Sequence, residues 1–142
     1  MSEVQMPLID HLSVGVADID RARVFYDSVL AALGTGCLAA DDEFAAYGQI
    51  RPEFLLLLPY DGGAPTGGNG THIAFSAESK DAVDSFHAAA LENGGTCEGA
   101  PGGRDFYPMP DAYTAYVRDS FGNKLEVIFN GFSTQEAPEG NT

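Results

Sequence analysis

The sequence contains no tryptophan, and its 7 lysine and arginine residues are outnumbered by 21 aspartate and glutamate residues, which gives a formal net charge of −14. A charge of this sign argues against nucleic acid and anionic membranes as partners. An anionic small substrate stays possible, because one arginine in a buried site can dominate the local field. The absence of tryptophan weakens any binding mode that relies on indole stacking.

Long apolar runs are also missing. The run from Phe54 to Leu58 has the length of a strand, far below the roughly 18 residues of a membrane-spanning helix. No basic segment followed by an apolar one is visible at the N-terminus, so we expect no signal peptide and a cytoplasmic location. The cysteines, Cys37 and Cys97, are predicted to be buried thiols in a reducing compartment rather than a disulfide.

What the sequence does contain is an internal repeat. The short apolar segment around His11 returns around His72, and identities continue at the same offset of 61 residues. The other identical pairs are Asp20 and Asp81, Phe25 and Phe86, Leu30 and Leu91, Gly34 and Gly95, and Thr35 and Thr96. Identities in one constant register indicate a duplicated strand–helix unit, with a histidine at the same place in each copy.

Each copy is predicted to fold as β-α-β-β-β. In the first copy, a strand is expected at 8–16 and is followed by a helix with an apolar stripe, which Asp18 caps at its start and Gly34 ends. Further strands are expected at about 36–40, 44–50 and 54–59. In the second copy, Ser79 caps a helix at about 80–93. The strands of this copy are expected at 70–76, 96–98, 113–119 and 124–130, with a tight loop at 99–104 and a hairpin turn at 119–123.

The chain is therefore predicted to be one α+β domain spanning residues 1–142. Its parts are a first module at about 8–60, a linker rich in glycine and proline at 61–69, a second module at about 70–131, and a loose C-terminal tail at 132–142. We expect two curved antiparallel sheets that close around a shared cleft, with the helices outside.

Glu126 is the most unusual residue of the last strand, because it lies opposite the apolar Leu125 and Val127 in the alternation. A carboxylate there is costly unless it is paired, protonated or bound to a cation, although an edge strand facing solvent is an alternative. His11 or His72 alone indicates a hydrogen-bonded interior histidine. Together with Glu126, they form a set of ligands with open positions that suits catalytic Fe(II), Mn, Ni, Co or Zn.

At this point the sequence resembles a known family. The duplicated β-α-β-β-β pattern, the paired histidines and the closing motif Asp-Ser-Phe-Gly-Asn-Lys-Leu-Glu at 119–126 are similar to the vicinal oxygen chelate superfamily. That family includes glyoxalase I, extradiol dioxygenases, fosfomycin-resistance proteins and bleomycin-binding proteins, and its motif has proline where this chain has Ser120. The resemblance implies a glyoxalase-like fold, metal ligation by His11, His72 and Glu126, and a homodimer, sometimes with exchanged modules.

The resemblance also bears on the reaction and the substrate. By the resemblance, the position of the fourth ligand of glyoxalase I falls at Leu56, which cannot coordinate a metal, and Glu53 could do so only if the strand were shifted. A site with two histidines and one glutamate is instead similar to those of extradiol dioxygenases and fosfomycin-modifying enzymes.

Counting back from Glu126, Thr114 and Tyr116 are expected on the same face of the sheet, pointing into the cleft. By the resemblance, Ser13, Thr114 and Tyr116 match substrate-contacting positions of the fosfomycin-modifying enzymes. A phosphonate substrate is disfavoured, because Phe106 occupies the place of a basic residue.

The other candidate residues lie in the second module. Tyr116 is a candidate catalytic proton donor, and Tyr107 is a candidate wall of a substrate pocket. Arg104, in a glycine-rich loop, is a candidate for holding a ligand carboxylate or phosphate, with an ion pair to a neighbouring aspartate as the alternative. His87 has no histidine counterpart in the first copy, where Tyr26 stands, and we interpret it as structural.

Two functions from different classes remain open. The first is a metal-dependent lyase, isomerase or ring-cleaving dioxygenase, whose small-molecule substrate chelates the ion through neighbouring oxygens. The alternative is a metal-free protein that sequesters a ligand, as bleomycin-resistance proteins do. A third possibility is an inactive member that keeps His11, His72 and Glu126 as hydrogen-bonded core residues.

Overall fold

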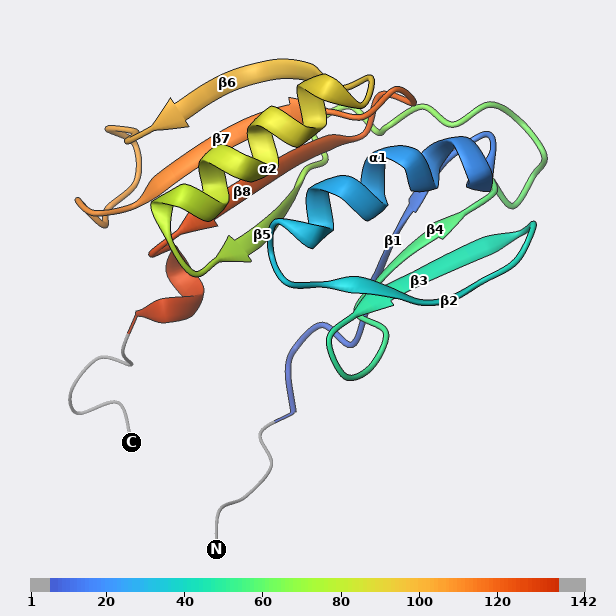
Figure 1. The fold of residues 1–142 in the computed structure, drawn as a ribbon, viewed down its shortest axis with the longest axis horizontal. Coiled ribbons are helices and arrows are strands. Elements are labelled where there is room, and N and C mark those ends of the chain that lie inside the picture. Colours follow the sequence, from blue (N-terminus) through green and yellow to red (C-terminus); the bar gives the residue numbers. More distant parts are fainter. Residues whose placement is uncertain (1–5, 136–142) are drawn as a thin grey trace, which may run out of the picture.

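The structure, a computed structural model, describes residues 6–135 and contains two successive β-α-β-β-β modules (Figure 1). The first module consists of β1 (Leu12–Gly15), α1 (Ile19–Ala31), β2 (Gly36–Ala40), β3 (Phe44–Gly48) and β4 (Phe54–Leu57). The second consists of β5 (Ile73–Ala77), α2 (Lys80–Glu92), β6 (Thr96–Gly102), β7 (Tyr113–Arg118) and β8 (Lys124–Phe129), followed by the 3₁₀ helix η1 (Phe132–Thr134). The predicted α+β duplication is confirmed.

Both helices begin and end where local chemistry predicts. The side chain of Asp18 accepts the backbone N–H of Arg21 at the start of α1, and Ser79 accepts that of Ala82 at the start of α2. After α1 the chain turns at Gly34, whose φ of 70° lies in the left-handed region that glycine adopts without a steric penalty. The predicted caps are therefore confirmed.

Each sheet is mixed rather than antiparallel. The strand order is β1-β4-β3-β2 in one sheet and β5-β8-β7-β6 in the other. The first and last strands of each module run parallel to each other, so the prediction of antiparallel sheets is wrong for these pairs. The helical crossover returns the chain to its starting end, and the two reversals that follow give the last strand the direction of the first.

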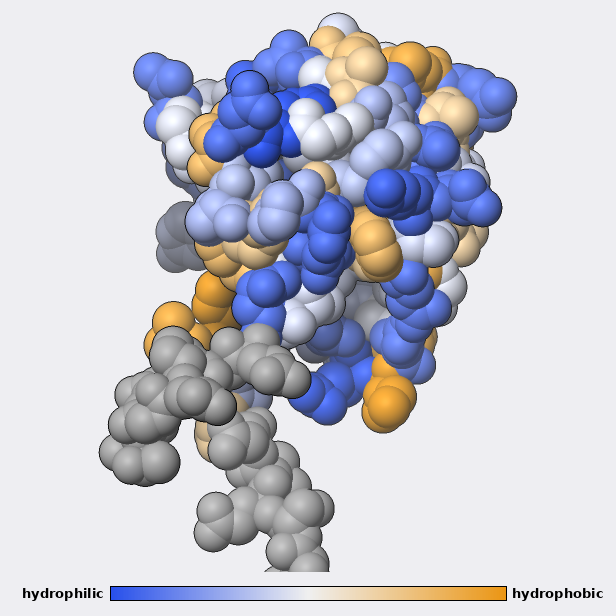
Figure 2. Space-filling model, turned by 90° about the vertical axis from the view of Figure 1, so that its left-hand side faces the viewer, coloured by the Kyte–Doolittle hydropathy of each residue, from blue (hydrophilic) through white to orange (hydrophobic). Residues whose placement is uncertain are grey.

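Other differences concern the ends of elements. β6 extends to Gly102, through irregularities in its register with β7, where the sequence predicted a loop from Gly99. The tail predicted to be loose from residue 132 begins with η1, and its residues 136–142 lie outside the described chain. None of the helices within residues 6–135 is long and apolar enough to span a membrane. The face seen in Figure 2 is mostly hydrophilic, and its hydrophobic residues form small, separate groups.

One hydrophobic core joins the two modules on the helix side of the sheets. In Figure 1, α1 and α2 lie side by side, and they pack against each other. Phe54 of β4 meets Phe75 of β5 edge to face, with ring centroids 5.1 Å apart. Gly95 permits a close approach, because a Cβ atom there would lie 2.8 Å from the ring of Phe25. The face of each sheet that points away from the helices is called the open face below.

The turn between β7 and β8 also ties the second module to the first. The hydroxyl of Tyr26 on α1 donates to Asp119 Oδ2 at 2.5 Å, and Asn123 Nδ2 donates to the carbonyl of Gly15 at 2.8 Å. Asp119 also accepts the backbone N–H groups of Phe121 and Asn123. The polar residues of the closing motif therefore hold both the hairpin and the contact between the modules.

We predict that Tyr26→Phe lowers the free energy of unfolding by about 2 kcal/mol, the cost of removing a donor from a buried acidic acceptor. Burial, followed by the neighbouring Asp119, raises the pKa of Tyr26 well above its usual value. Folded Tyr26 therefore keeps its proton above about pH 10, where unfolded tyrosine loses it. Wild-type stability should then fall with rising pH more steeply than that of the variant, by about 1.4 kcal/mol per pH unit. Urea unfolding at neutral and alkaline pH measures both effects.

Tyr60→Phe is the matched control, because Tyr60 is fully exposed. This change should alter the free energy of unfolding by no more than about 0.5 kcal/mol. If Tyr26→Phe and Tyr60→Phe behave alike, the hydrogen bond to Asp119 does not stabilise the contact between the modules.

Candidate functional site

Glu126 is a buried carboxylate in the interior of the second sheet. β8 lies between β5 and β7, and Glu126 is aligned with Ala74 on one side and Tyr116 on the other. Its neighbours Leu125 and Val127 point to the opposite face and join the core. The exposed fraction of Glu126 is 0%, so the alternative of a solvent-facing residue is wrong. A carboxylate in this position requires hydrogen-bond donors or a cation.

Side chains from three segments converge on this carboxylate. His72 Nε2 lies 3.0 Å from Glu126 Oε1. The hydroxyl of Tyr107 donates to Oε2 at 2.6 Å, and the hydroxyl of Thr114 lies 2.7 Å from the same oxygen. The Thr114 hydroxyl is also 2.9 Å from the carbonyl of Val127, so its single proton is shared between two acceptors. Protein hydroxyls therefore hold Oε2, whereas Oε1 faces His72.

Two tyrosines lie beside this pair. Burial and then the hydrogen bond to Glu126 raise the pKa of Tyr107, so this phenol stays protonated and acts as a donor. The pKa of Tyr116 is raised mainly by burial. The Tyr116 ring lies 6.1 Å from that of His72, and the guanidinium of Arg104 stacks 5.6 Å from its centroid. The raised pKa keeps the Tyr116 phenol protonated and makes it a weaker acid than a free tyrosine, so its candidacy as a proton donor rests on its position beside His72.

The pair formed by His72 and Glu126 fits two ligand positions of a divalent ion. In an octahedral site, neighbouring ligands about 2.1 Å from the ion are about 3.0 Å apart, which is also the length of an ordinary hydrogen bond. The observed distance between His72 Nε2 and Glu126 Oε1 is 3.0 Å. The hydroxyls on Oε2 would keep the carboxylate oriented, as partners of metal ligands commonly do. Within this pair solvent reaches only His72, whose side chain is 44% exposed, because Glu126 is fully buried.

His11 does not reach this pair within one chain. It lies just before β1, at the edge of the first sheet, and its side chain is 54% exposed. Its Nδ1 is 2.6 Å from the carboxylate of Asp10, and it lines a groove that also contains Glu53. Within residues 6–135, no group of three histidine, cysteine, aspartate or glutamate side chains could hold a metal. One chain therefore supplies only part of the predicted ligand set.

The remaining candidates lie in different surroundings. Arg104 donates to backbone carbonyls of its own loop rather than to a neighbouring aspartate. Ser13 is exposed and is aligned with Leu55 of β4. Leu56, the predicted counterpart of the fourth ligand of glyoxalase I, is buried in the core instead. Neither Leu55 nor Leu56 can coordinate a metal. Whichever of the two corresponds to the fourth ligand of glyoxalase I, this position of β4 supplies no ligand.

Sequence reasoning missed that Tyr107 and Thr114 bind Glu126 directly. For Thr114 a signal existed, because the hairpin turn aligns Thr114 with Ile128, which lies two residues from Glu126 on the same face. Tyr107 lies between β6 and β7, where no strand or helix periodicity exists to orient it. Its contact with Glu126 depends on how this connection folds back over the open face.

We predict that Tyr107→Phe lowers the free energy of unfolding by about 2 kcal/mol, because a buried carboxylate loses a donor. Tyr113→Phe is the matched control. It removes the same hydroxyl from a 2.7 Å hydrogen bond, but the acceptor is the exposed Asp84. Its cost should be below about 1 kcal/mol. Urea unfolding at neutral pH measures both, and equal costs would show that burial of Glu126 does not require the Tyr107 hydroxyl.

Comparison with known proteins identifies the family. The family model of the Glyoxalase/Bleomycin resistance protein/Dioxygenase superfamily matches residues 8–127. No protein of curated function matches the chain.

Solved structures agree with this assignment. A glyoxalase/bleomycin resistance protein from Albidiferax ferrireducens T118 is 38% identical over 87% of this chain and 99% of that chain, with a TM-score of 0.78. A glyoxalase/bleomycin resistance protein/dioxygenase family enzyme from Burkholderia phytofirmans PsJN shares the fold at 19% identity, with a TM-score of 0.65 over 84% of this chain and 96% of that one. The predicted resemblance is confirmed, and the chain belongs to the glyoxalase/bleomycin resistance protein/dioxygenase superfamily.

Proposed function

We propose that the protein is a metal-dependent enzyme of this superfamily, which acts on a small molecule that chelates a divalent ion through neighbouring oxygens. The observation that carries the proposal is the contact at 3.0 Å between Nε2 of the half-exposed His72 and Oε1 of the buried Glu126. Imidazole and carboxylate ligands suit Fe(II), Mn, Ni, Co and Zn. The hydrogen-bonded Oε2 leaves Oε1 as the oxygen available to an ion.

The third ligand in this proposal is His11 of a second copy of the chain. The modules of one chain meet through their helix sides, and the exposed residues Ser13, Ala74 and Ser76 lie on the open faces near both histidines. In a two-fold symmetric dimer, the first module of one chain can face the second module of its partner. Each of the two sites then contains His72 and Glu126 of one chain and the partner's His11.

The chemistry follows from this arrangement. When bound, a divalent ion polarises the oxygens of its substrate and stabilises the negative charge that develops on them. Tyr107 and Thr114 orient Glu126, and Tyr116 is the proposed proton donor. Arg104 and Ser13 are proposed to contact the substrate. Isomerisation, lyase chemistry and ring-cleaving oxygenation all use this set of groups.

The alternative is a metal-free protein that sequesters its ligand. The relative from Albidiferax ferrireducens carries a name that joins glyoxalase and bleomycin resistance protein, so its similarity is compatible with either function. The hydrogen bonds from Tyr107, Thr114 and His72 would satisfy Glu126 without a metal. The two proposals differ in metal content.

We predict about one divalent ion per chain in the wild-type protein purified without chelator, and loss of this ion in His11→Ala and in His72→Ala. Co-refolding the two variants in equal amounts should restore about a quarter of the wild-type metal content per chain. Random pairing makes about half of the dimers mixed, and each mixed dimer has one intact site. Elemental analysis after gel filtration measures the content.

His87→Gln is the matched control, since it removes the remaining histidine, which lies on α2 away from the site, and it should keep its metal. A site made within one chain predicts no restoration in the mixture, because every chain would then lack a ligand. A metal-free wild type would contradict the enzyme proposal and favour the ligand-sequestering protein.

A further inference from the structure

A thiol–imidazole pair lies outside the site described above. His87 Nε2 of α2 is 3.2 Å from Cys97 Sγ of β6. Cys97 is exposed, so the prediction that both cysteines are buried is wrong for this residue. β6 is the edge strand of its sheet, which leaves Cys97 open to small molecules from solvent.

The pair is on the opposite side of the sheet from Glu126. Cys97 is aligned with Val117, which belongs to the core beneath the helices, whereas Glu126 is aligned with Tyr116 on the open face. The pair is therefore separate from the proposed metal ligands, and its chemistry does not depend on the proposed function.

His87 is suited to accept a proton from the thiol. Burial lowers the pKa of His87 below its usual value, and the nearby carboxylate of Asp84 opposes this effect. Asp84 is itself engaged by the hydroxyl of Tyr113 at 2.7 Å. The lowered pKa favours the neutral imidazole, which can accept a proton at a ring nitrogen, and it also makes His87 a weaker base than a free histidine. A neutral histidine in contact with a thiol is the arrangement that activates cysteine nucleophiles.

We propose that Cys97 is a thiol-modification site, at which His87 acts as the base, and that it forms mixed disulfides with low-molecular-weight disulfides. Cys97 transfers its proton to His87 Nε2, and the thiolate attacks one sulfur of the disulfide. A new bond between Cys97 Sγ and that sulfur forms as the original S–S bond breaks. The departing thiolate takes the proton from His87, so one thiol and one disulfide are consumed and one of each is produced.

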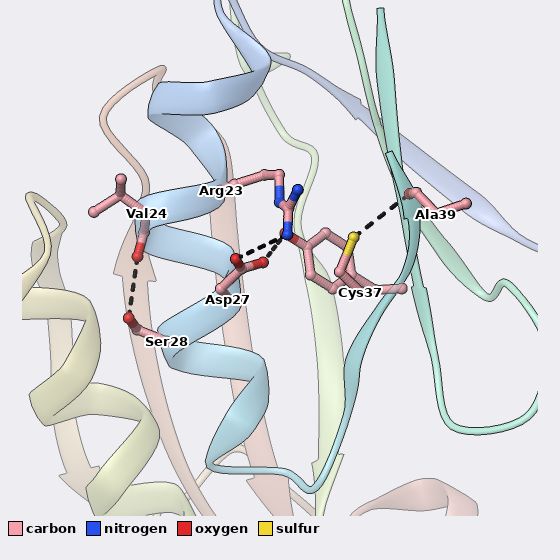
Figure 3. A network of polar contacts seen from close by, with 7 residues as sticks. Arg23, Val24, Asp27, Ser28, Cys37 and Ala39 are labelled. Atoms are coloured by element: carbon pink, nitrogen blue, oxygen red, sulfur yellow. Dashed lines mark hydrogen bonds and ion pairs between the residues drawn. The ribbon is translucent and has the colours of Figure 1, made fainter. Parts of the chain in front are cut away.

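The first module provides an internal control. At the position that corresponds to His87 it has Tyr26, and its own cysteine, Cys37, is half-buried. Figure 3 shows the Cys37 thiol directed at the carbonyl of Ala39, at 3.5 Å. A backbone carbonyl accepts a hydrogen bond but does not act as a base toward the thiol. The nearby carboxylate of Asp27 accepts hydrogen bonds from Arg23, at 3.2 Å, and from the hydroxyl of Tyr47. It is therefore not positioned as a base for Cys37.

The test is the rate of mixed-disulfide formation at each cysteine. The reduced full-length protein is incubated at neutral pH with 2-hydroxyethyl disulfide, a neutral reagent that is unaffected by the net charge of −14. Quenched samples are digested, and the adduct at each cysteine is quantified by mass spectrometry. We expect Cys97 to react about tenfold faster than Cys37 in the wild type. In His87→Gln the Cys97 rate should fall about tenfold, with the Cys37 rate unchanged.

Two results would overturn the proposal. The first is equal or slower reaction of Cys97 relative to Cys37 in the wild type, a comparison that needs no variant. The second is an unchanged Cys97 rate in His87→Gln, in which glutamine keeps the size of the side chain and the helix propensity but cannot take up the proton. The rate of mixed-disulfide formation at Cys37 reports the integrity of the fold in the same sample, so a rise in this rate in His87→Gln would identify unfolding. In that case the Cys97 rate is measured in His87→Asn instead, and an unchanged rate there would likewise overturn the proposal.

Discussion

The burial of the Glu126 carboxylate is the constraint on which the second module depends. Burying a neutral polar group without a hydrogen bond costs roughly 2–7 kcal/mol, and burying an ionised carboxylate costs more. Glu126 therefore requires hydrogen-bond donors or a cation around it. This chain meets the requirement with His72, which directly precedes β5, Thr114 of β7, and Tyr107 of the connection between β6 and β7. That connection is thereby held over the open face, and the same contacts leave one carboxylate oxygen facing an accessible histidine.

A second constraint comes from the way the two modules join. Both helices and both sheets contribute to one core, and the hydrogen bond of Tyr26 to Asp119 reinforces this contact across the modules. Within one chain, the groove that contains His11 is also lined by Ala74 and Ser76 of β5, but among the described residues no third ligand side chain joins His72 and Glu126. The site proposed above, which two chains would assemble, accounts for the duplicated histidines and would make assembly a condition for the proposed activity.

Local patterns predicted the elements well because their causes are local. The caps at Asp18 and Ser79, the turn at Gly34, and the face shared by Glu126 and Thr114 follow from the spacing of a few residues. The errors arose where distant segments decide. The parallel pairing of β1 with β4 depends on the path of the whole module, and the exposure of Cys97 depends on β6 being an edge strand. Leu56 was placed on the wrong face because its strand is apolar throughout, so alternation gave no signal.

The sequence by itself determined the duplicated β-α-β-β-β modules and the family, since periodicity, capping and motif spacing are properties of short segments. It also singled out His11, His72 and Glu126 as the proposed metal ligands. Only the tertiary structure decided which of those residues meet. His72 and Glu126 come together because His72 directly precedes β5, which pairs with β8 in one sheet, whereas His11 precedes the edge strand of the other sheet. Contacts between segments far apart in the chain depend on how whole surfaces pack against each other. Many core residues contribute to that packing, so no single motif predicts these contacts.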